Sequence, residues 1–209
     1  MSAIAAYRTA ILALLADPTL VIFTNNDVDQ ALRWALAEYS YRRPLIRTYQ
    51  FSVDVSTSMH QLPADFITRH ITRVQLYNAD PDSIVDLSFY AFKLDEQWMI
   101  NTRNFVEAGE VLQISYSDGH QVDGLDSAAG TTVPDADETL LEIGAAGHAA
   151  QMRALNRVET INMNPDVVKT YRDQAVQYLT TFSALLTSEP GPQAYVGDFP
   201  GDRPGHVVF

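Results

Sequence analysis

The sequence predicts an α+β protein: a helical bundle of about four helices with an inserted antiparallel β unit and an extended C-terminal tail. Three observations predict this class. Apolar residues recur with helical spacing in both outer parts of the chain, they alternate with polar residues through its middle, and prolines and glycines are concentrated after residue 189. We therefore expect the bundle to comprise residues 1–43 and 130–189, the β unit residues 44–129, and the tail residues 190–209.

Two helices are expected before the β unit. The first covers residues 4–15, with its apolar residues broadly on one side. The second begins with Asn26 as N-cap and has Asp27 and Asp29 in its first turn, where negative charge suits the helix dipole. Its buried stripe has the spacing i, i+4, i+7, i+8, i+11 and consists of Val28, Leu32, Ala35, Leu36 and Tyr39.

After the second helix the apolar period changes from helical to alternating. Residues 45–55 predict a half-buried strand, and residues 70–77 predict another. Two apolar, aromatic runs on either side of Asp95 and Glu96 predict a hairpin, and residues 111–117 predict a fifth strand. Together these strands predict an antiparallel unit between the second and third helices.

A long helix is expected over residues 134–160, with Asp135 and Glu138 at the spacing of a capping box. Its middle offers almost no side-chain bulk over Gly144, Ala145, Ala146, Gly147, Ala149 and Ala150. Two glycines inside a helix cost about 1 kcal/mol each relative to alanine, so another backbone is expected to pack closely there. This helix is either a plain core helix or part of a subunit–subunit seam. The seam would use Gly144, Ala145, Gly147 and His148.

A fourth helix is expected to start with Asn164 as N-cap and Pro165 at its first position, and to stop before Pro190. The tail that follows has four prolines and four glycines, so neither helix nor regular strand is favoured. It nevertheless contains isolated aromatic residues and an apolar end, namely Tyr195, Phe199, Val207, Val208 and Phe209. Three interpretations are open: the tail docks on a partner, packs against its own body, or is disordered.

The composition restricts the function classes. Apolar residues at 46% and charged residues at 19% are typical of an ordinary globular protein. The net charge of −12 argues against a surface that grips nucleic acid, but it permits a conduit through which DNA slides. The absence of cysteine excludes disulfides, thiolate zinc sites and a cysteine nucleophile. The first apolar run lacks the basic flank and length of an export signal or membrane span, so we expect a soluble protein made in the cytoplasm.

No catalytic signature is recognisable, since the chain has no nucleophile-elbow, Walker, zincin or dinucleotide motif. We therefore expect no catalytic residues, no metal and no cofactor. The histidines lack helical metal spacing; they are His60, His70, His120, His148 and His206. The carboxylates of Asp118, Asp123 and Asp126 are better explained as a solvated turn than as a calcium loop, because they do not match the EF-hand pattern.

The aromatic residues of the β unit have two interpretations. Trp34 and Trp98, with Phe89, Tyr90 and Phe92, could form a platform on which sugars stack. The same residues are also explained by packing in the core. Exposure of Trp98 or Tyr90 would favour the platform.

Four motifs follow one another between Asp27 and Thr160. They are a helix end with Tyr39, Ser40, Arg43 and Pro44; the pair Leu62 and Pro63 before a strand; a strand end with Tyr116 and His120; and a helix start with Thr132, Pro134 and Asp135. In this order they resemble the head-to-tail adaptor (neck connector) proteins of tailed bacteriophages and prophages. The tail after Glu189 has no counterpart in this resemblance.

The resemblance implies a structural virion protein without enzymatic activity. Such adaptors form a ring, dodecameric by analogy with the portal, which lies in the virion neck between the portal and the next tail or neck protein. DNA passes through the central channel without specific binding, and no membrane is involved. The helices would form the ring wall and the tail would hook into the portal. A tail terminator or stopper, a baseplate component with a carbohydrate-binding β module, and a hydrolase centred on His120 or His148 are the alternatives.

Overall fold

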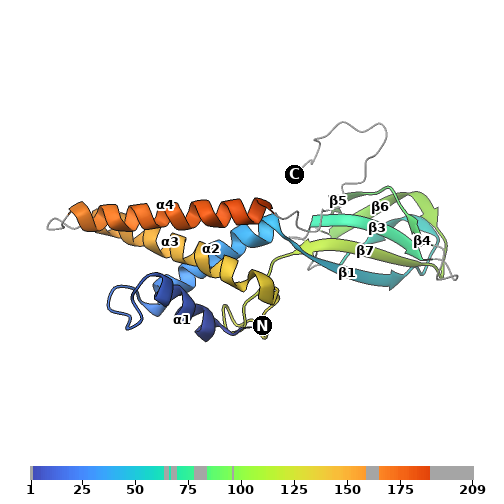
Figure 1. Cartoon of the computed structure of the whole chain (residues 1–209). Coiled ribbons are helices and arrows are strands. Elements are labelled where there is room, and N and C mark those ends of the chain that lie inside the picture. The colour runs from blue at the N-terminus through green and yellow to red at the C-terminus, as the bar shows by residue number, and fades with distance from the viewer. Residues whose placement is uncertain are drawn as a thin grey trace. The chain divides into compact units, whose positions relative to one another are not determined.

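The computed structural model describes residues 2–63, 66, 70–77, 84–95, 97–158 and 165–188. Within this part of the chain there are four α-helices and seven β-strands, so the protein belongs to the α+β class as predicted (Figure 1). The described residues divide into a helical unit, residues 2–45 and 119–188, and a β unit, residues 46–118.

The helical unit is organised around its third helix. Its helices are α1 (Ile4–Leu14), α2 (Asn25–Arg42), α3 (Glu138–Val158) and α4 (Pro165–Ser188). α3 contacts α1, α2 and α4, and α3 and α4 lie side by side along much of their length (Figure 1). Their shared core includes Tyr7, Leu32, Leu141 and Phe182, all fully buried. No helix among the described residues is long and apolar enough to cross a lipid bilayer.

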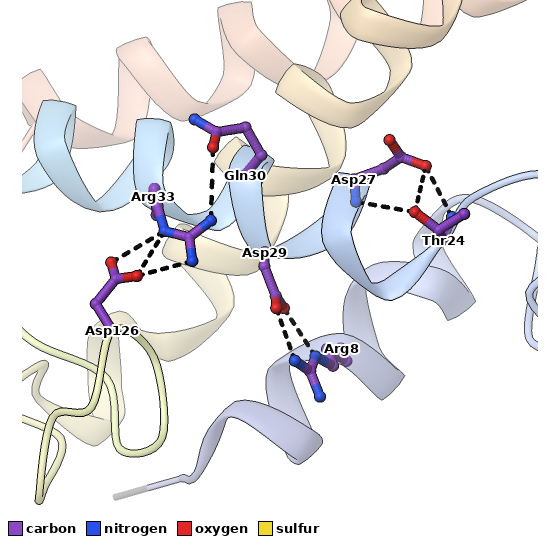
Figure 2. Close-up of polar contacts among 7 residues, drawn as sticks. All are labelled: Arg8, Thr24, Asp27, Asp29, Gln30, Arg33 and Asp126. Atoms are coloured by element: carbon purple, nitrogen blue, oxygen red, sulfur yellow. Dashed lines mark hydrogen bonds and ion pairs between the residues drawn. The ribbon is translucent and has the colours of Figure 1, made fainter.

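α2 begins two residues earlier than its predicted N-cap implies. Thr24 is the N-cap: its Oγ1 accepts a hydrogen bond from the Asp27 backbone nitrogen at 3.2 Å, and the Asp27 carboxylate accepts one from the Thr24 nitrogen at 2.8 Å (Figure 2). The prediction of Asn26 as N-cap is therefore wrong. Thr24 and Asp27 close a reciprocal capping box, whereas Asp29, the acidic residue three positions after Asn26, bonds to Arg8 instead.

Two ion pairs join α2 to its surroundings (Figure 2). Asp29 accepts two hydrogen bonds from Arg8 of α1, at 2.8 and 2.7 Å. Arg33 pairs with Asp126, in the segment after the β unit, at 2.7 Å. Asp29 is thus a partner of α1 rather than only a charge at the helix start. Residues 119–133 also pack into the helical core, through Val122, Leu125 and Val133.

The start of α3 differs from the prediction. A short 3-10 helix, η2 (Asp135–Asp137), precedes it, and Pro134 before η2 makes no side-chain cap. Asp135 therefore lies within η2 and is not the N-cap of α3. The Glu138 carboxylate accepts hydrogen bonds from the Ser2 nitrogen at 2.7 Å and from the Ser2 hydroxyl at 2.8 Å. The expected carboxylate is present, but it fastens the first residues of the chain to α3. Asn164, the predicted N-cap of α4, lies outside the described residues.

The β unit consists of two antiparallel sheets. The four-stranded sheet has the order β1 (Leu45–Ser52), β7 (Val111–Asp118), β3 (His70–Tyr77), β4 (Ile84–Asp86). The three-stranded sheet has the order β2 (Thr57–Gln61), β6 (Gln97–Val106), β5 (Tyr90–Leu94). Val74 and Ile114 from one sheet and Ile100 from the other enter one buried cluster, so the sheets share a core.

The five predicted strands are all present, including the hairpin of β5 and β6, which pair from Tyr90 opposite Asn101 to Leu94 opposite Gln97. The sequence did not indicate β2 or β4. β2 directs a histidine, His60, into the core instead of an aliphatic residue, and β4 has three residues that are all exposed. Neither strand has the apolar alternation on which strand prediction depends.

Candidate partner-binding surfaces

The small residues of α3 lie under α4. A Cβ atom on Gly144 would lie 2.9 Å from the ring of Phe182, and one on Gly147 would lie 2.9 Å from the Leu179 side chain and 3.1 Å from its backbone nitrogen. The close approach that these residues permit is therefore used within the chain, by α4. We do not assign Gly144, Ala145 or Gly147 to a subunit seam.

His148, the fourth residue of the expected seam, lies where α2 and α3 meet. Its Nε2 is 3.7 Å from the Glu38 carboxylate, and its ring packs edge-to-face against Trp34 with centroids 5.8 Å apart. Burial lowers the pKa of His148, against the opposing effect of Glu38. A neutral, mostly buried imidazole in this position packs the helices together.

The motif residues of α2 come together with His120. Ser40 Oγ accepts a hydrogen bond from the His120 backbone nitrogen at 2.9 Å, and His120 Nε2 lies 3.0 Å from the Arg43 carbonyl oxygen. The Tyr39 ring packs against the His120 ring at 5.0 Å. Sequence reasoning identified these residues only as separate motifs. The structure makes them one polar network that joins the end of α2 to the segment after β7.

The same network reaches the start of α3 and the end of α4. The Tyr39 hydroxyl and the Arg43 guanidinium both donate hydrogen bonds to the Asp137 carboxylate, the latter at 2.9 Å. Arg43 also donates to the Leu185 carbonyl oxygen at 3.1 Å. Burial, followed by the hydrogen bond to Asp137, raises the pKa of Tyr39. These hydrogen bonds join four segments: the end of α2, the residues after β7, the start of α3 and the last turn of α4.

The three aspartates considered for calcium do not form a common site. Asp118 pairs with Arg47 at 3.0 Å within the β unit, and Asp126 pairs with Arg33 within the helical unit. Within the described ranges no group of three or more histidine or acidic side chains is placed to hold a metal ion.

The aromatic residues divide between core and surface. Phe89 and Trp98 pack against the core of the β unit, and Trp34 belongs to α2. Tyr90 is 50% exposed, and its ring lies 5.6 Å from that of Phe92. Of the expected platform residues in the β unit, Tyr90 is exposed and Phe92 beside it is half-buried, whereas Trp34, 43% exposed, lies on α2 in the helical unit.

Tyr90 and Phe92 belong to a larger outer face of the three-stranded sheet. Residues that pair directly across antiparallel strands point to the same side of the sheet. One row is Tyr90, Asn101 and Met59, the next is Phe92, Met99 and Gln61, and the last is Leu94 and Gln97. Tyr90, Leu94 and Met59 are 50, 49 and 47% exposed, and none of the eight residues is charged. We call these eight residues the apolar sheet face.

The other sheet carries a row of polar side chains that bond to one another, from exposed Gln50 to buried Gln75. Gln113 accepts a hydrogen bond from Gln50 and donates one to Gln75 across three strands, the latter at 3.3 Å. Arg73 and Asp86 add a bidentate ion pair with both distances at 2.7 Å. These polar side chains satisfy one another, whereas the apolar sheet face leaves Met59, Tyr90 and Leu94 exposed, which marks it as a candidate contact surface.

A second candidate surface lies on α4. From Gln174 to Ser188 the sequence has no charged residue, although much of this stretch is exposed; Val176, for example, is 61% exposed. Thr181 and Thr187 donate their hydroxyl hydrogens to carbonyl oxygens of their own helix, at 2.9 and 3.0 Å. Their polar groups are satisfied within the helix, which reduces the cost of covering this face. The exposed residues are Val176, Gln177, Thr180, Thr181, Ser183, Ala184, Leu185, Thr187 and Ser188; we call them the neutral α4 face.

The third candidate, the apolar tail residues, lies outside the described residues. This applies to Tyr195, Phe199, Val207, Val208 and Phe209. Sequence comparison adds nothing to these surfaces: a scan against protein-family models finds no match, and a search of curated proteins finds no significant relative.

Proposed function

We propose that this protein is a structural component of a bacteriophage virion, a head-to-tail adaptor without enzymatic activity. Copies assemble into a ring, dodecameric by analogy with the portal, between the portal and the downstream tail or neck protein. The helices form the wall of the ring as a bundle, the β unit projects towards the tail or periphery, and residues 190–209 extend as a tail that hooks into the portal. DNA passes through the central channel.

The neutral α4 face is the observation that carries this proposal. Copies of a chain with a net charge of −12 repel one another over most of their surfaces. A helix face without charged residues, on which Thr181 and Thr187 are satisfied internally, is the part of the helical unit where copies meet with least repulsion and desolvation cost. The acidic balance also suits a channel that DNA must leave freely. The order of sequence motifs adds the specific role.

The decisive experiment puts charge on the neutral α4 face. In the variant Val176→Glu with Ala184→Glu, like charges face each other at the seam, so we expect the ring to be lost while the monomer stays folded. Light scattering after size exclusion and negative-stain images of the wild type and the variant measure this. Because both positions are exposed, the unfolding free energy should change by no more than about 0.5 kcal/mol per site.

A matched control lies on the same helix. Thr170→Glu adds a negative charge at an exposed position among Lys169, Arg172 and Asp173, and should leave the ring intact. A wild type that stays monomeric with and without portal, or rings that persist in the doubly charged variant, would contradict the proposed assembly.

A carbohydrate-binding module is the second candidate, favoured by the half-exposed Tyr90 next to Phe92. Exposed aromatic rings flanked by the amides of Gln61, Gln97 and Asn101 suit sugar rings and hydroxyl groups. In that case a soluble glycan should bind the wild type but not the Tyr90→Ala variant. Binding by both, or by neither, would remove this candidate.

A further inference from the structure

The apolar sheet face is too small to join two copies of the protein by itself. Three strands about 4.8 Å apart and about five residues long span roughly 14 by 17 Å, or about 240 Å². A stable interface between proteins buries about 800 Å² on each partner. A patch of this size fits one short apolar segment rather than a second globular surface.

The sequence contains such a segment. Residues 189–209 follow α4 and include Tyr195, Phe199 and the consecutive apolar residues Val207, Val208 and Phe209. The segment also carries Glu189, Asp198, Asp202 and Arg203, but the five apolar residues just named match the five apolar residues of the uncharged sheet face in chemistry.

A contact inside the helical unit places the last turn of α4 near the residues that lead into the β unit. Arg43, at the end of α2, donates a hydrogen bond to the carbonyl oxygen of Leu185, in the last turn of α4. The β unit begins at Ile46, three residues after Arg43 along the chain. The last turn of α4 therefore lies close to the residues that lead into the β unit.

The segment is long enough to reach the face. At about 3.3 Å per extended residue, the chain after Ser188 spans up to about 23 Å by Tyr195 and about 70 Å by Phe209. The longest strand, β6, has ten residues and a length of about 33 Å. Tethering on this scale gives an effective concentration in the millimolar range, so modest affinity suffices for the segment to occupy the face.

We infer that the C-terminal segment, residues 195–209, docks on the apolar sheet face of its own chain, covering Met59, Tyr90, Phe92, Leu94 and Met99. The inference does not require the proposed function. If the tail also hooks into the portal, the two uses are sequential: the sheet face covers the apolar residues until the portal competes for them. The apolar residues of the free subunit would then be protected from aggregation.

Disulfide trapping in purified protein tests this docking. The chain has no cysteine, so an engineered pair is the only one present. In the variant Leu94→Cys with Val207→Cys, mild oxidation should close a bond within one chain, read as a mobility shift without reducing agent and as an intact monomer mass. Met59→Cys with Val207→Cys repeats the test from the opposite edge strand, should the first pair impair folding.

The control pair is Thr48→Cys with Val207→Cys. Thr48 is an exposed residue on the polar outer side of β1, and it lies closer along the chain to Arg43 than Leu94 does. If the segment moved freely without docking, the control pair should therefore close at least as fast as the Leu94 pair. Docking predicts that the Leu94 pair closes at least about tenfold faster, reflecting the effective concentration at the face. Equal closure rates for the two pairs would overturn the inference.

Two further measurements distinguish other occupants. Replacing Tyr195 and Phe199 by serine in the Leu94 pair should slow closure, because the apolar side chains drive docking. In a mixture of the single variants Leu94→Cys and Val207→Cys, a bond formed as readily as in the double variant would place the segment on another copy and refute docking within one chain. Dimers of Leu94→Cys alone formed at the same rate would show sheet-to-sheet contact of copies and would also refute it.

Discussion

His60 is a buried histidine without a charged partner. It is 5% exposed, its Nε2 has no hydrogen-bond partner among the described residues, and its ring packs 6.0 Å from that of Phe51. Burial lowers the pKa of His60 below its ordinary value. The neutral imidazole therefore behaves as a core side chain of β2, and its protonation opposes folding of the β unit.

This environment makes stability dependent on pH. Below about pH 6.5, the ordinary histidine pKa, the unfolded chain binds the proton that folded His60 resists, so the stability contributed by neutral His60 is lost as pH falls towards the lowered pKa. We expect the His60→Leu variant to lose less unfolding free energy between pH 7 and pH 5 than the wild type. Urea denaturation at several pH values measures this.

His148 provides the comparison within the helical unit, because burial lowers its pKa as well. The His60→Leu variant should retain the part of the pH dependence that comes from His148. An unchanged slope in the His60→Leu variant would mean that His60 is not the titrating group.

At the scale of elements, the contact between α3 and α4 depends on two positions without side chains. The Cβ atoms missing from Gly144 and Gly147 would overlap Phe182 and Leu179. At Gly147 the obstacle includes the backbone nitrogen of Leu179, which cannot move without shifting α4. The helices approach so closely because the sequence omits bulk where they meet.

We predict that Gly147→Ala destabilises the protein although alanine favours helix. The propensity gain is about 1 kcal/mol, whereas overpacking against a helix backbone that cannot shift costs up to about 3 kcal/mol, so the net loss should reach up to about 2 kcal/mol. Thermal or urea unfolding measures it. Gly130→Ala is the matched control, because a Cβ there meets nothing within 4 Å and should be close to neutral. A more stable Gly147→Ala variant would show that α4 does not pack here.

At the scale of the whole molecule, the chain builds a helical unit from two separated segments and inserts the β unit between them. The chain passes between the units after residue 45 and after residue 118. The network around Arg43 and His120 lies in the helical unit next to both of these positions, and the Arg47–Asp118 ion pair lies next to them in the β unit. Both places where the chain crosses between the units are therefore fixed by polar contacts within each unit. The apolar sheet face and the neutral α4 face contain none of these four residues.

Removal of the tail tests its proposed role in assembly. A chain ending at Glu189 retains every residue of both described cores, so it should remain folded. If the tail hooks into the portal, this variant should no longer join portal-bearing heads, measured as the yield of completed particles in an in vitro assembly assay. Undiminished head completion by the truncated protein would refute the hook, whereas the disulfide test above concerns the isolated chain alone.

The sequence by itself determined the class and the positions of most elements. The period of apolar residues is a local property, so α2 and β1 could be predicted from the sequence. The run of small residues around Gly144 likewise predicted a close contact with another helix. The sequence also indicated that no familiar catalytic motif is present. β2 was missed because its core residue, His60, is not aliphatic.

Only the tertiary structure decided which distant segments meet. It paired Glu138 with Ser2 rather than with a cap at Asp135, placed α4 instead of another subunit over Gly147, and brought His120 to Arg43. It also decided that one sheet carries a row of bonded polar side chains and the other an apolar face, because cross-strand register determines which side chains share a face. Such pairings join residues far apart in sequence, and local periodicity carries no information about them.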